Sequence, residues 1–165
     1  MSSDRLSQAE KQLESLYGQF NEIEDDITNN QNPQARAQSK QQLKNLKPRI
    51  QEYEKEYLQA LQQQAVELTF VEVDAQAVID VVAEEISRIE SNAQVYPDAL
   101  LQQVREIRKK LDEPGTSAAL KIKPVITLLP PGIGLAIEGE LDVENFLRRN
   151  FPTFTRLIRG SQAKK

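Results

Sequence analysis

Residues 5–28 of the chain read RLSQAEKQLESLYGQFNEIEDDIT. The apolar residues of this stretch recur at alternating steps of three and four positions, a spacing that places them on one side of a slightly underwound helix. The stretch therefore predicts a coiled-coil-like helix that buries one narrow stripe against another helix. The members of this stripe are Leu6, Ala9, Leu13, Leu16, Phe20, Ile23 and Ile27.

A second stretch repeats the pattern after the polar segment NNQNP, residues 29–33. Asn32 is a favoured helix cap and Pro33 suits the first helical position, so a second helix is expected to begin there. Pro48 predicts a kink, or alternatively a break at Lys47, and the unbroken apolar phase favours the kink. The two helices predict an antiparallel hairpin over residues 1–66. The second stripe comprises Leu43, Leu46, Ile50, Tyr53, Tyr57 and Ala60.

The rest of the chain predicts a small helix-rich α+β unit, residues 67–160, and a disordered tail, residues 161–165. Residues 68–74 carry β-branched and aromatic side chains and fit a strand or the start of a helix equally well. Strict alternation over residues 135–141 predicts a strand, whose mate is residues 68–73 or a strand of another chain. The predicted fold class is therefore mainly α with a small β component. Apolar spacing and helix-starting residues predict the other helices over 75–91, 97–111, 117–129 and 142–147, with a turn at 151–154.

The chain contains neither cysteine nor histidine among its 165 residues. This excludes disulfides and thiol nucleophiles, and it removes the commonest general base and metal ligand. The glycines of PPGIG, residues 130–134, match no phosphate-binding motif. We therefore predict no catalytic residue, no cofactor and no metal site, and a protein that is not an enzyme. The alternating acids are better explained as a solvated strand face than as a cation site: Glu138, Glu140, Asp142 and Glu144.

Charge is unevenly distributed along the chain. Residues 67–115 carry 5 basic and 11 acidic groups, whereas residues 116–165 carry 8 basic and 4 acidic groups. Packing of the acidic middle on the basic end explains this better than an anionic partner does, and a solvated helix face explains the basic end better than nucleic acid. A membrane surface remains the alternative ligand, because the apolar turn 130–137 precedes the basic end. The residues for such a contact are Arg148, Arg149, Arg156 and Arg159.

The N-terminus has no apolar core of the secretory kind, which predicts a cytoplasmic protein. Apolar residues beside the second stripe, Leu58, Leu61, Ala65 and Leu68, predict a homo-oligomer or a complex with another protein through an exposed surface. The apolar groups of residues 118–158 predict one unit that packs on residues 75–111 or on a partner. The residues predicted for seam and docking are Leu13, Leu16, Phe20, Ile23, Leu46, Ile50, Tyr53, Tyr57, Leu135, Ile137, Phe151 and Phe154.

Two segments carry a resemblance to known proteins. They are LESLYGQFNEIEDDITNNQNPQARAQSKQQLKNLKPRIQEYEKEY, residues 13–57, and LLPPGIGLAIEGELDVENFLRRNFPTFTRLIRG, residues 128–160. The first resembles a helical hairpin of bacterial, largely cyanobacterial, multidomain signalling and defence proteins, where it accompanies NTPase, TIR or protease effectors. The second resembles a C-terminal segment of the same proteins. This resemblance implies an adaptor or effector-associated role, although the present sequence carries no effector.

Overall fold

The structure, a computed structural model, describes residues 2–129 and 146–163. These residues form six α-helices and one short 3-10 helix, with no strand among them. The chain divides into two compact units, Met1–Ala60 and Leu61–Lys165, which we call the hairpin unit and the helical unit. The predicted domain boundary, between residues 66 and 67, lies near this division.

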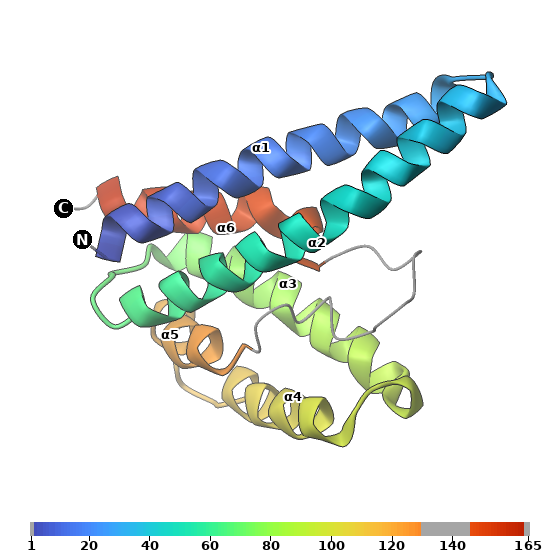
Figure 1. The fold of residues 1–165 in the computed structure, drawn as a ribbon. Coiled ribbons are helices and arrows are strands. Elements are labelled where there is room, and N and C mark those ends of the chain that lie inside the picture. The colour runs from blue at the N-terminus through green and yellow to red at the C-terminus, as the bar shows by residue number, and fades with distance from the viewer. Residues whose placement is uncertain (1, 130–145, 164–165) are drawn as a thin grey trace. The chain divides into compact units, whose positions relative to one another are not determined.

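The hairpin unit is built from α1 (Ser2–Asn29) and the greater part of α2 (Pro33–Gln64), which run in opposite directions from a three-residue turn (Figure 1). The Asn32 side chain accepts a hydrogen bond from the Gln34 backbone amide at 3.0 Å, so Asn32 caps α2 as predicted. α2 continues through Pro48 without a break. The alternative of two helices separated at Lys47 is therefore wrong.

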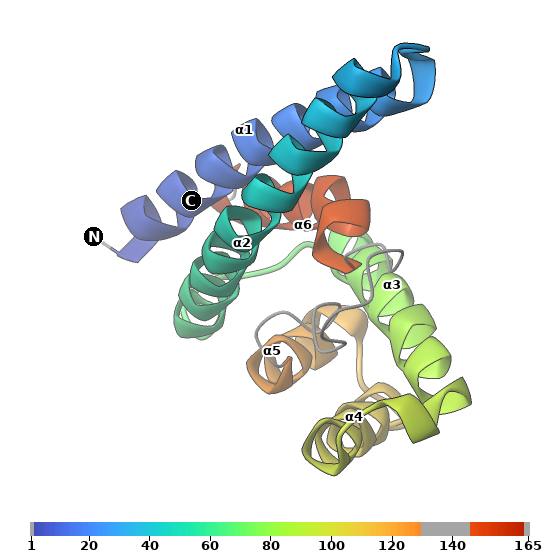
Figure 2. The same ribbon diagram turned by 45° about the vertical axis from the view of Figure 1, so that its right-hand side comes forward.

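The helical unit is organised around α3 (Glu72–Ser91), which contacts three other helices, α4 (Asp98–Leu111), α5 (Ala118–Leu128) and α6 (Phe146–Ala163). Figure 2 shows α4 and α5 beside α3. The 3-10 helix η1 (Ala93–Val95) joins α3 to α4. Because α5 and α6 both pack on α3, the predicted docking of residues 118–158 on residues 75–111 is confirmed for its described part. Apolar residues of α3 at helical spacing form the centre of this core: Ala75, Val78, Ile79, Val82, Ile86 and Ile89.

Side chains hold several helix ends of this unit. The Glu72 carboxylate at the start of α3 accepts hydrogen bonds from the backbone amides of Ala118 and Ala119, both at 2.9 Å, and so caps α5. At the other end of α5, the Gln103 amide donates to the Leu128 carbonyl at 2.7 Å. Gly115, with φ of +76°, makes the turn between α4 and α5, a conformation that favours glycine. These contacts satisfy backbone groups that a short helix leaves unpaired.

The predicted β component is wrong for the described residues. Leu68 and Phe70 are buried and Thr69 is exposed, which is the alternation of an extended segment, but no described strand pairs with it. α3 then begins at Glu72, so the helix takes over the end of the predicted strand. β-branched residues favour strands only where a partner is present, and here burial against helices replaces that partner. The other predicted strand, 135–141 with Leu135 and Ile137, lies outside the described residues, as does the predicted helix start at residue 142.

The C-terminal segment differs from the prediction in two places. α6 continues through Pro152, so the predicted turn at 151–154 is wrong. Phe151 and Phe154 are buried on either side of this proline, and their packing offsets the one backbone hydrogen bond that proline removes. α6 also extends to Ala163 with Ser161 buried, where a disordered tail was predicted from residue 161.

The apolar surface predicted for self-association is not exposed. Leu58, Leu61, Ala65 and Leu68 are all buried in the folded chain. At this end of α2, the Gln62 side chain donates hydrogen bonds to the carbonyls of Ile126 and Leu129, so α5 lies against it within the helical unit. A pattern of apolar residues on one helix does not show which other elements cover them, and the predicted surface is therefore wrong.

Candidate functional site

The predicted seam residues of the hairpin occupy two different environments. Six of them are buried, whereas Ile23 and Tyr53 are half-buried. The buried ones stabilise the hairpin and are not accessible to a partner, so the accessible part of the seam is limited. The six buried residues are Leu13, Leu16, Phe20, Leu46, Ile50 and Tyr57.

Hydrogen bonds between polar side chains connect α1 and α2 at two positions along the hairpin. The Tyr17 hydroxyl donates a hydrogen bond to Oε2 of the fully buried Glu54 at 2.5 Å. Nearer the turn, the Ser39 hydroxyl donates to Asp26 Oδ2 at 2.5 Å. These two bonds fix the register of α1 against α2. Burial, and secondarily the charge of Glu10, raises the pKa of Tyr57 well above its usual value.

The interface between α1 and α2, which we call the seam, becomes less buried toward the turn. Over residues 21–45, all of which the structure describes, Ser39 is the one buried residue. The apolar stripe itself continues through this part as Ile23, Ile27 and Leu43, each half-buried. We call residues 19–49 the distal hairpin. It combines a regular apolar stripe with incomplete burial, a property typical of surfaces that contact another protein.

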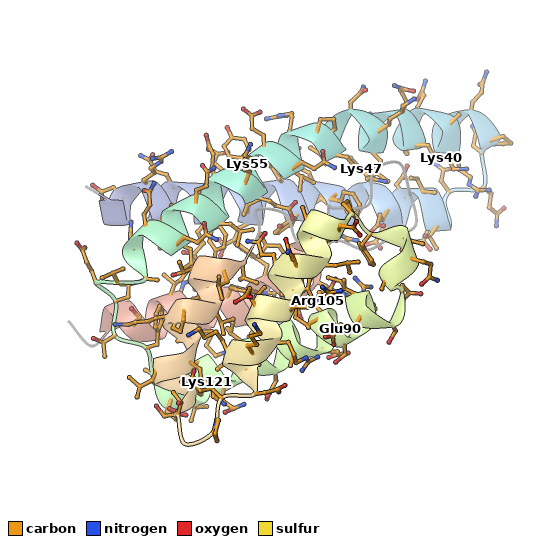
Figure 3. The ribbon with its side chains drawn as sticks, turned by 90° about the horizontal axis from the view of Figure 1, so that it is seen from below. Lys40, Lys47, Lys55, Glu90, Arg105 and Lys121 are labelled. Atoms are coloured by element: carbon orange, nitrogen blue, oxygen red, sulfur yellow. The ribbon has the colours of Figure 1, made fainter. Side chains whose placement is uncertain are left out.

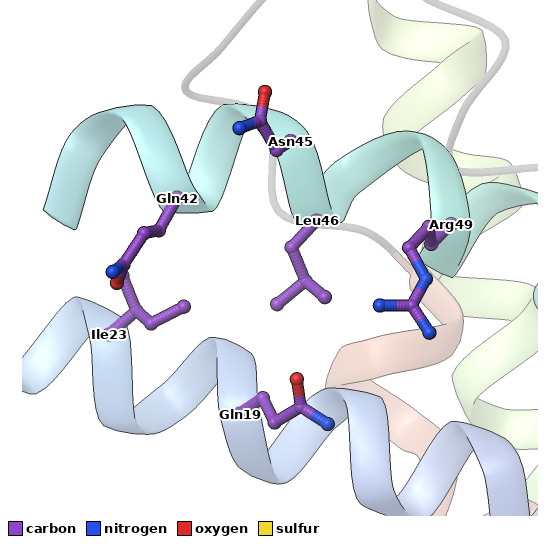
Figure 4. A pocket seen from close by; sticks show the side chains of 6 residues that line it. All are labelled: Gln19, Ile23, Gln42, Asn45, Leu46 and Arg49. Atoms are coloured by element: carbon purple, nitrogen blue, oxygen red, sulfur yellow. The ribbon is translucent and has the colours of Figure 1, made fainter. Parts of the chain in front are cut away.

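A groove opens on one side of the distal hairpin, between α1 and α2 (Figure 4). Ile23 and Leu46 provide its apolar part, and the rest of its wall is polar. Side-chain amides donate and accept hydrogen bonds at once, and a guanidinium adds five donors. The groove can therefore bind a helix or loop that offers both apolar and polar groups. Its polar lining residues are Gln19, Gln42, Asn45 and Arg49.

The four polar lining residues were not among the sites predicted from the sequence. A signal was present, since Gln19 and Gln42 each precede a seam residue by four positions and Arg49 follows Leu46 by three. Such spacings place side chains on the same helix face. The pattern does not show that the stripe beside them stays half-buried, and without that fact these residues look like an ordinary solvated surface.

The basic C-terminal end is partly engaged inside the helical unit. Arg149 on α6 contacts Oε2 of the buried Glu85 on α3 through Nη2 at 3.0 Å. Arg88 pairs with the other oxygen of Glu85 at 2.5 Å. Glu85 belongs to the acidic middle, so this contact supports the interpretation that the acidic and basic segments pack on each other. Arg148 is half-buried, while Arg156 and Arg159 are exposed on the same helix.

The other predicted docking residues of the C-terminal unit belong to its core. Phe151 and Phe154 are buried, and Phe154 packs edge to face on Phe146, with ring centroids 5.9 Å apart. A contact with a partner through these rings would require the helical unit to open. Leu135, Ile137 and the apolar turn 130–137 lie outside the described residues.

Residues 2–129 and 146–163 contain no cluster of three or more acidic side chains placed to hold a metal ion. The alternating acids at 138–144 lie outside this part of the chain. In the same described ranges, no helix has the length and apolar character that crossing a bilayer requires.

Comparison with known proteins gives no match to a family model, to a curated protein or to a solved structure. The resemblance to hairpin modules of signalling and defence proteins therefore stays a prediction.

Proposed function

We propose that this protein is a non-enzymatic, cytoplasmic protein-interaction module that binds its partner through the distal hairpin. The observation that carries the proposal is the half-buried apolar stripe of Ile23, Ile27 and Leu43, which continues past the point where the seam is closed. The free energy of partner binding comes from covering apolar surface of this kind. An adaptor role in signalling or defence follows from the resemblance of residues 13–57.

The groove gives this surface its specificity. Apolar contact at the half-buried Ile23 supplies affinity, while the amides of Gln19, Gln42 and Asn45 favour a partner that presents matching hydrogen-bond donors and acceptors. A helix laid along the groove would make both kinds of contact at once. The membrane alternative has less support, because Arg149 is committed to Glu85.

A matched pair of variants tests the proposal. Gln42→Arg changes the groove, whereas Gln51→Arg makes the same chemical change nine positions further along α2, which is the opposite face of the helix. Both side chains are exposed, so the fold should tolerate either change. The full chain and both variants are immobilised and incubated with extract of the native cell, and bound proteins are quantified by mass spectrometry.

The proposal predicts a set of proteins that the full chain and Gln51→Arg retain equally and that Gln42→Arg loses by about tenfold, the effect of removing a central polar contact. Vesicles of anionic lipid serve as a second probe. Binding of such vesicles that Arg156→Glu removes and Gln42→Arg leaves intact would favour the membrane alternative over the proposed function.

A further inference from the structure

Charge is segregated between the two helices of the distal hairpin. Residues 21–29 of α1 carry four acidic and no basic side chains, whereas residues 33–51 of α2 carry five basic and no acidic side chains. Two copies of such a hairpin are electrostatically complementary when α1 of one lies against α2 of the other. One chain thus contains both halves of a charge-complementary contact.

The groove side of the hairpin presents charges of both signs. Arg49 lines the groove from α2, and Glu22 follows the lining residue Gln19 by three positions, which places it at the groove edge of α1. Both side chains are exposed. Neither forms an ion pair with another of the described residues. Their charges are therefore available to a second molecule.

The register of the hairpin places Glu22 and Arg49 at similar positions along the helix axes. The Tyr17–Glu54 and Ser39–Asp26 hydrogen bonds bracket Glu22 and place it level with the turn of α2 that contains Asn45, Leu46 and Arg49. A helix rises 1.5 Å per residue, so a long guanidinium side chain readily spans the remaining offset. A second hairpin at the same height would therefore put its Glu22 within reach of Arg49.

Symmetry decides between the two ways of pairing the groove faces. A two-fold axis parallel to the helices sets α1 of one copy against α2 of the other, acid against base, with both turns at the same end. A two-fold axis perpendicular to the helices sets α1 against α1, so that acidic residues 22–26 meet acidic residues. Like charges placed opposite each other disfavour the second arrangement.

We infer that the groove face of the distal hairpin pairs with the same face of a second copy of this chain, in a parallel two-fold arrangement that joins Glu22 of each copy to Arg49 of the other. The inference rests on the proposed function and names the partner of the same surface. The half-buried Ile23 of each copy is then covered by α2 of the other copy, and the groove amides hydrogen-bond across the axis. The half-buried stripe becomes the core of a four-helix assembly.

Sedimentation equilibrium of the full chain tests the inference. The expected result is a reversible monomer–dimer equilibrium that weakens at high salt, because exposed ion pairs are screened. Arg49→Glu and Glu22→Arg should each weaken the dimer by about tenfold, since each reverses two symmetry-related pairs. The double variant restores the pairs with exchanged signs and should recover most of the affinity. Lys55→Glu, an exposed change elsewhere on α2 (Figure 3), is the matched control and should leave the dimer unchanged.

Thiol cross-linking tests the direction of pairing. The chain has no cysteine, so each introduced cysteine is the sole thiol of its copy. In the parallel arrangement, an equimolar mixture of Gln19→Cys and Asn45→Cys chains should give mixed disulfide dimers well in excess of the twofold ratio over either homodimer that random pairing produces. Preferential cross-linking of Gln19→Cys chains to each other would overturn it.

A chain that stays monomeric at all concentrations overturns the inference, and so does a dimer insensitive to both charge reversals. If the chain is monomeric but Gln42→Arg still loses a partner from extract, pairing with a second copy is wrong and the proposed function is unaffected. The proposed function fails if Gln42→Arg changes neither the proteins retained from extract nor self-association.

Discussion

The hairpin unit and the helical unit are both all-helical over their described residues, but different contacts hold them. The hairpin unit depends on one long apolar stripe per helix, which is closed from Leu6 to Phe20 and then opens toward the turn. In the helical unit α3 is surrounded by shorter helices, whose ends are fixed by side chains such as Glu72 and Gln103. Long helices need few such caps because most of their backbone groups pair internally, whereas in an eleven-residue helix like α5 the unpaired ends are a large fraction of the whole. The difference suggests that the helical unit loses stability through local polar changes, while the hairpin unit has surface left for binding.

The largest contrast is expected from truncating one phenylalanine in each unit. Phe154→Ala removes a fully buried ring that packs on Phe146 and should lower the free energy of unfolding by about 3–5 kcal/mol. Phe20→Ala should cost about 1–2 kcal/mol less, because the half-buried Ile23 beside it lets water or side chains fill the space. Urea unfolding followed by circular dichroism measures both. Leu120→Ala, at an exposed position, is the control, and equal losses at Phe20 and Phe154 would contradict the contrast.

Alkaline pH should affect the hairpin unit through Tyr57. Its pKa is raised, so the folded chain holds the phenol proton more tightly than the unfolded chain does. The contribution of Tyr57 to the free energy of unfolding is therefore fully present below pH 10, which is the ordinary pKa of tyrosine. Above it, stability falls by up to about 1.4 kcal/mol per pH unit until the folded pKa is reached.

Chemical unfolding between pH 9 and pH 11.5, in the native chain and in Tyr57→Phe, measures this effect. The variant should lose less stability across that interval than the native chain. Tyr96→Phe in the helical unit is the comparison, because partial burial raises the pKa of Tyr96 while Arg88 opposes and Glu85 adds to the rise. An alkaline slope unchanged in Tyr57→Phe would show that another group controls it.

Removal of a helix cap should reveal a smaller difference in stability between the two units. Glu72→Ala deletes two charge-assisted hydrogen bonds to the start of α5 and should cost about 1–2 kcal/mol. Asn32→Ala deletes one neutral bond at the start of α2 and should cost about 0.5–1 kcal/mol. Thermal melting monitored by circular dichroism ranks the two variants. A larger loss for Asn32→Ala would reverse the view that caps matter most in the helical unit.

The smallest effect is expected from two helical glycines. Gly18 in α1 has no atom within 4 Å of an added Cβ, so Gly18→Ala should raise stability by about 0.5–1 kcal/mol. At Gly160 in α6 an added Cβ overlaps Oδ2 of Asp74 on α3, so Gly160→Ala should not raise the stability. In an Asp74→Ala background, Gly160→Ala should recover the gain, which a double-mutant cycle reports as coupling. Additive effects at these two positions would show that α6 and α3 do not approach so closely.

The hairpin, its turn and its cap follow from local sequence patterns. Each depends on residues close together in the chain: the three-and-four spacing from Leu6 onward, and Asn32 with Pro33 at the turn. The same reasoning predicted helices over 75–91, 97–111 and 117–129, which correspond to α3, α4 and α5. It found the apolar half of the groove, Ile23 and Leu46, but not its polar half. Local periodicity is enough where one helix face meets one neighbour.

Other predicted features changed because they depend on packing between segments that are distant in the chain. Residues 68–71 are extended without a described partner strand, and α6 continues through Pro152 because buried rings on both sides of the proline stabilise it. Leu61 and Ala65, predicted as exposed surface, are buried, and Arg149 pairs with Glu85, which lies 64 positions away in the chain. Which residues are buried and which side chains pair depends on elements that are distant in sequence. A helical pattern of apolar residues does not indicate which other element packs against it.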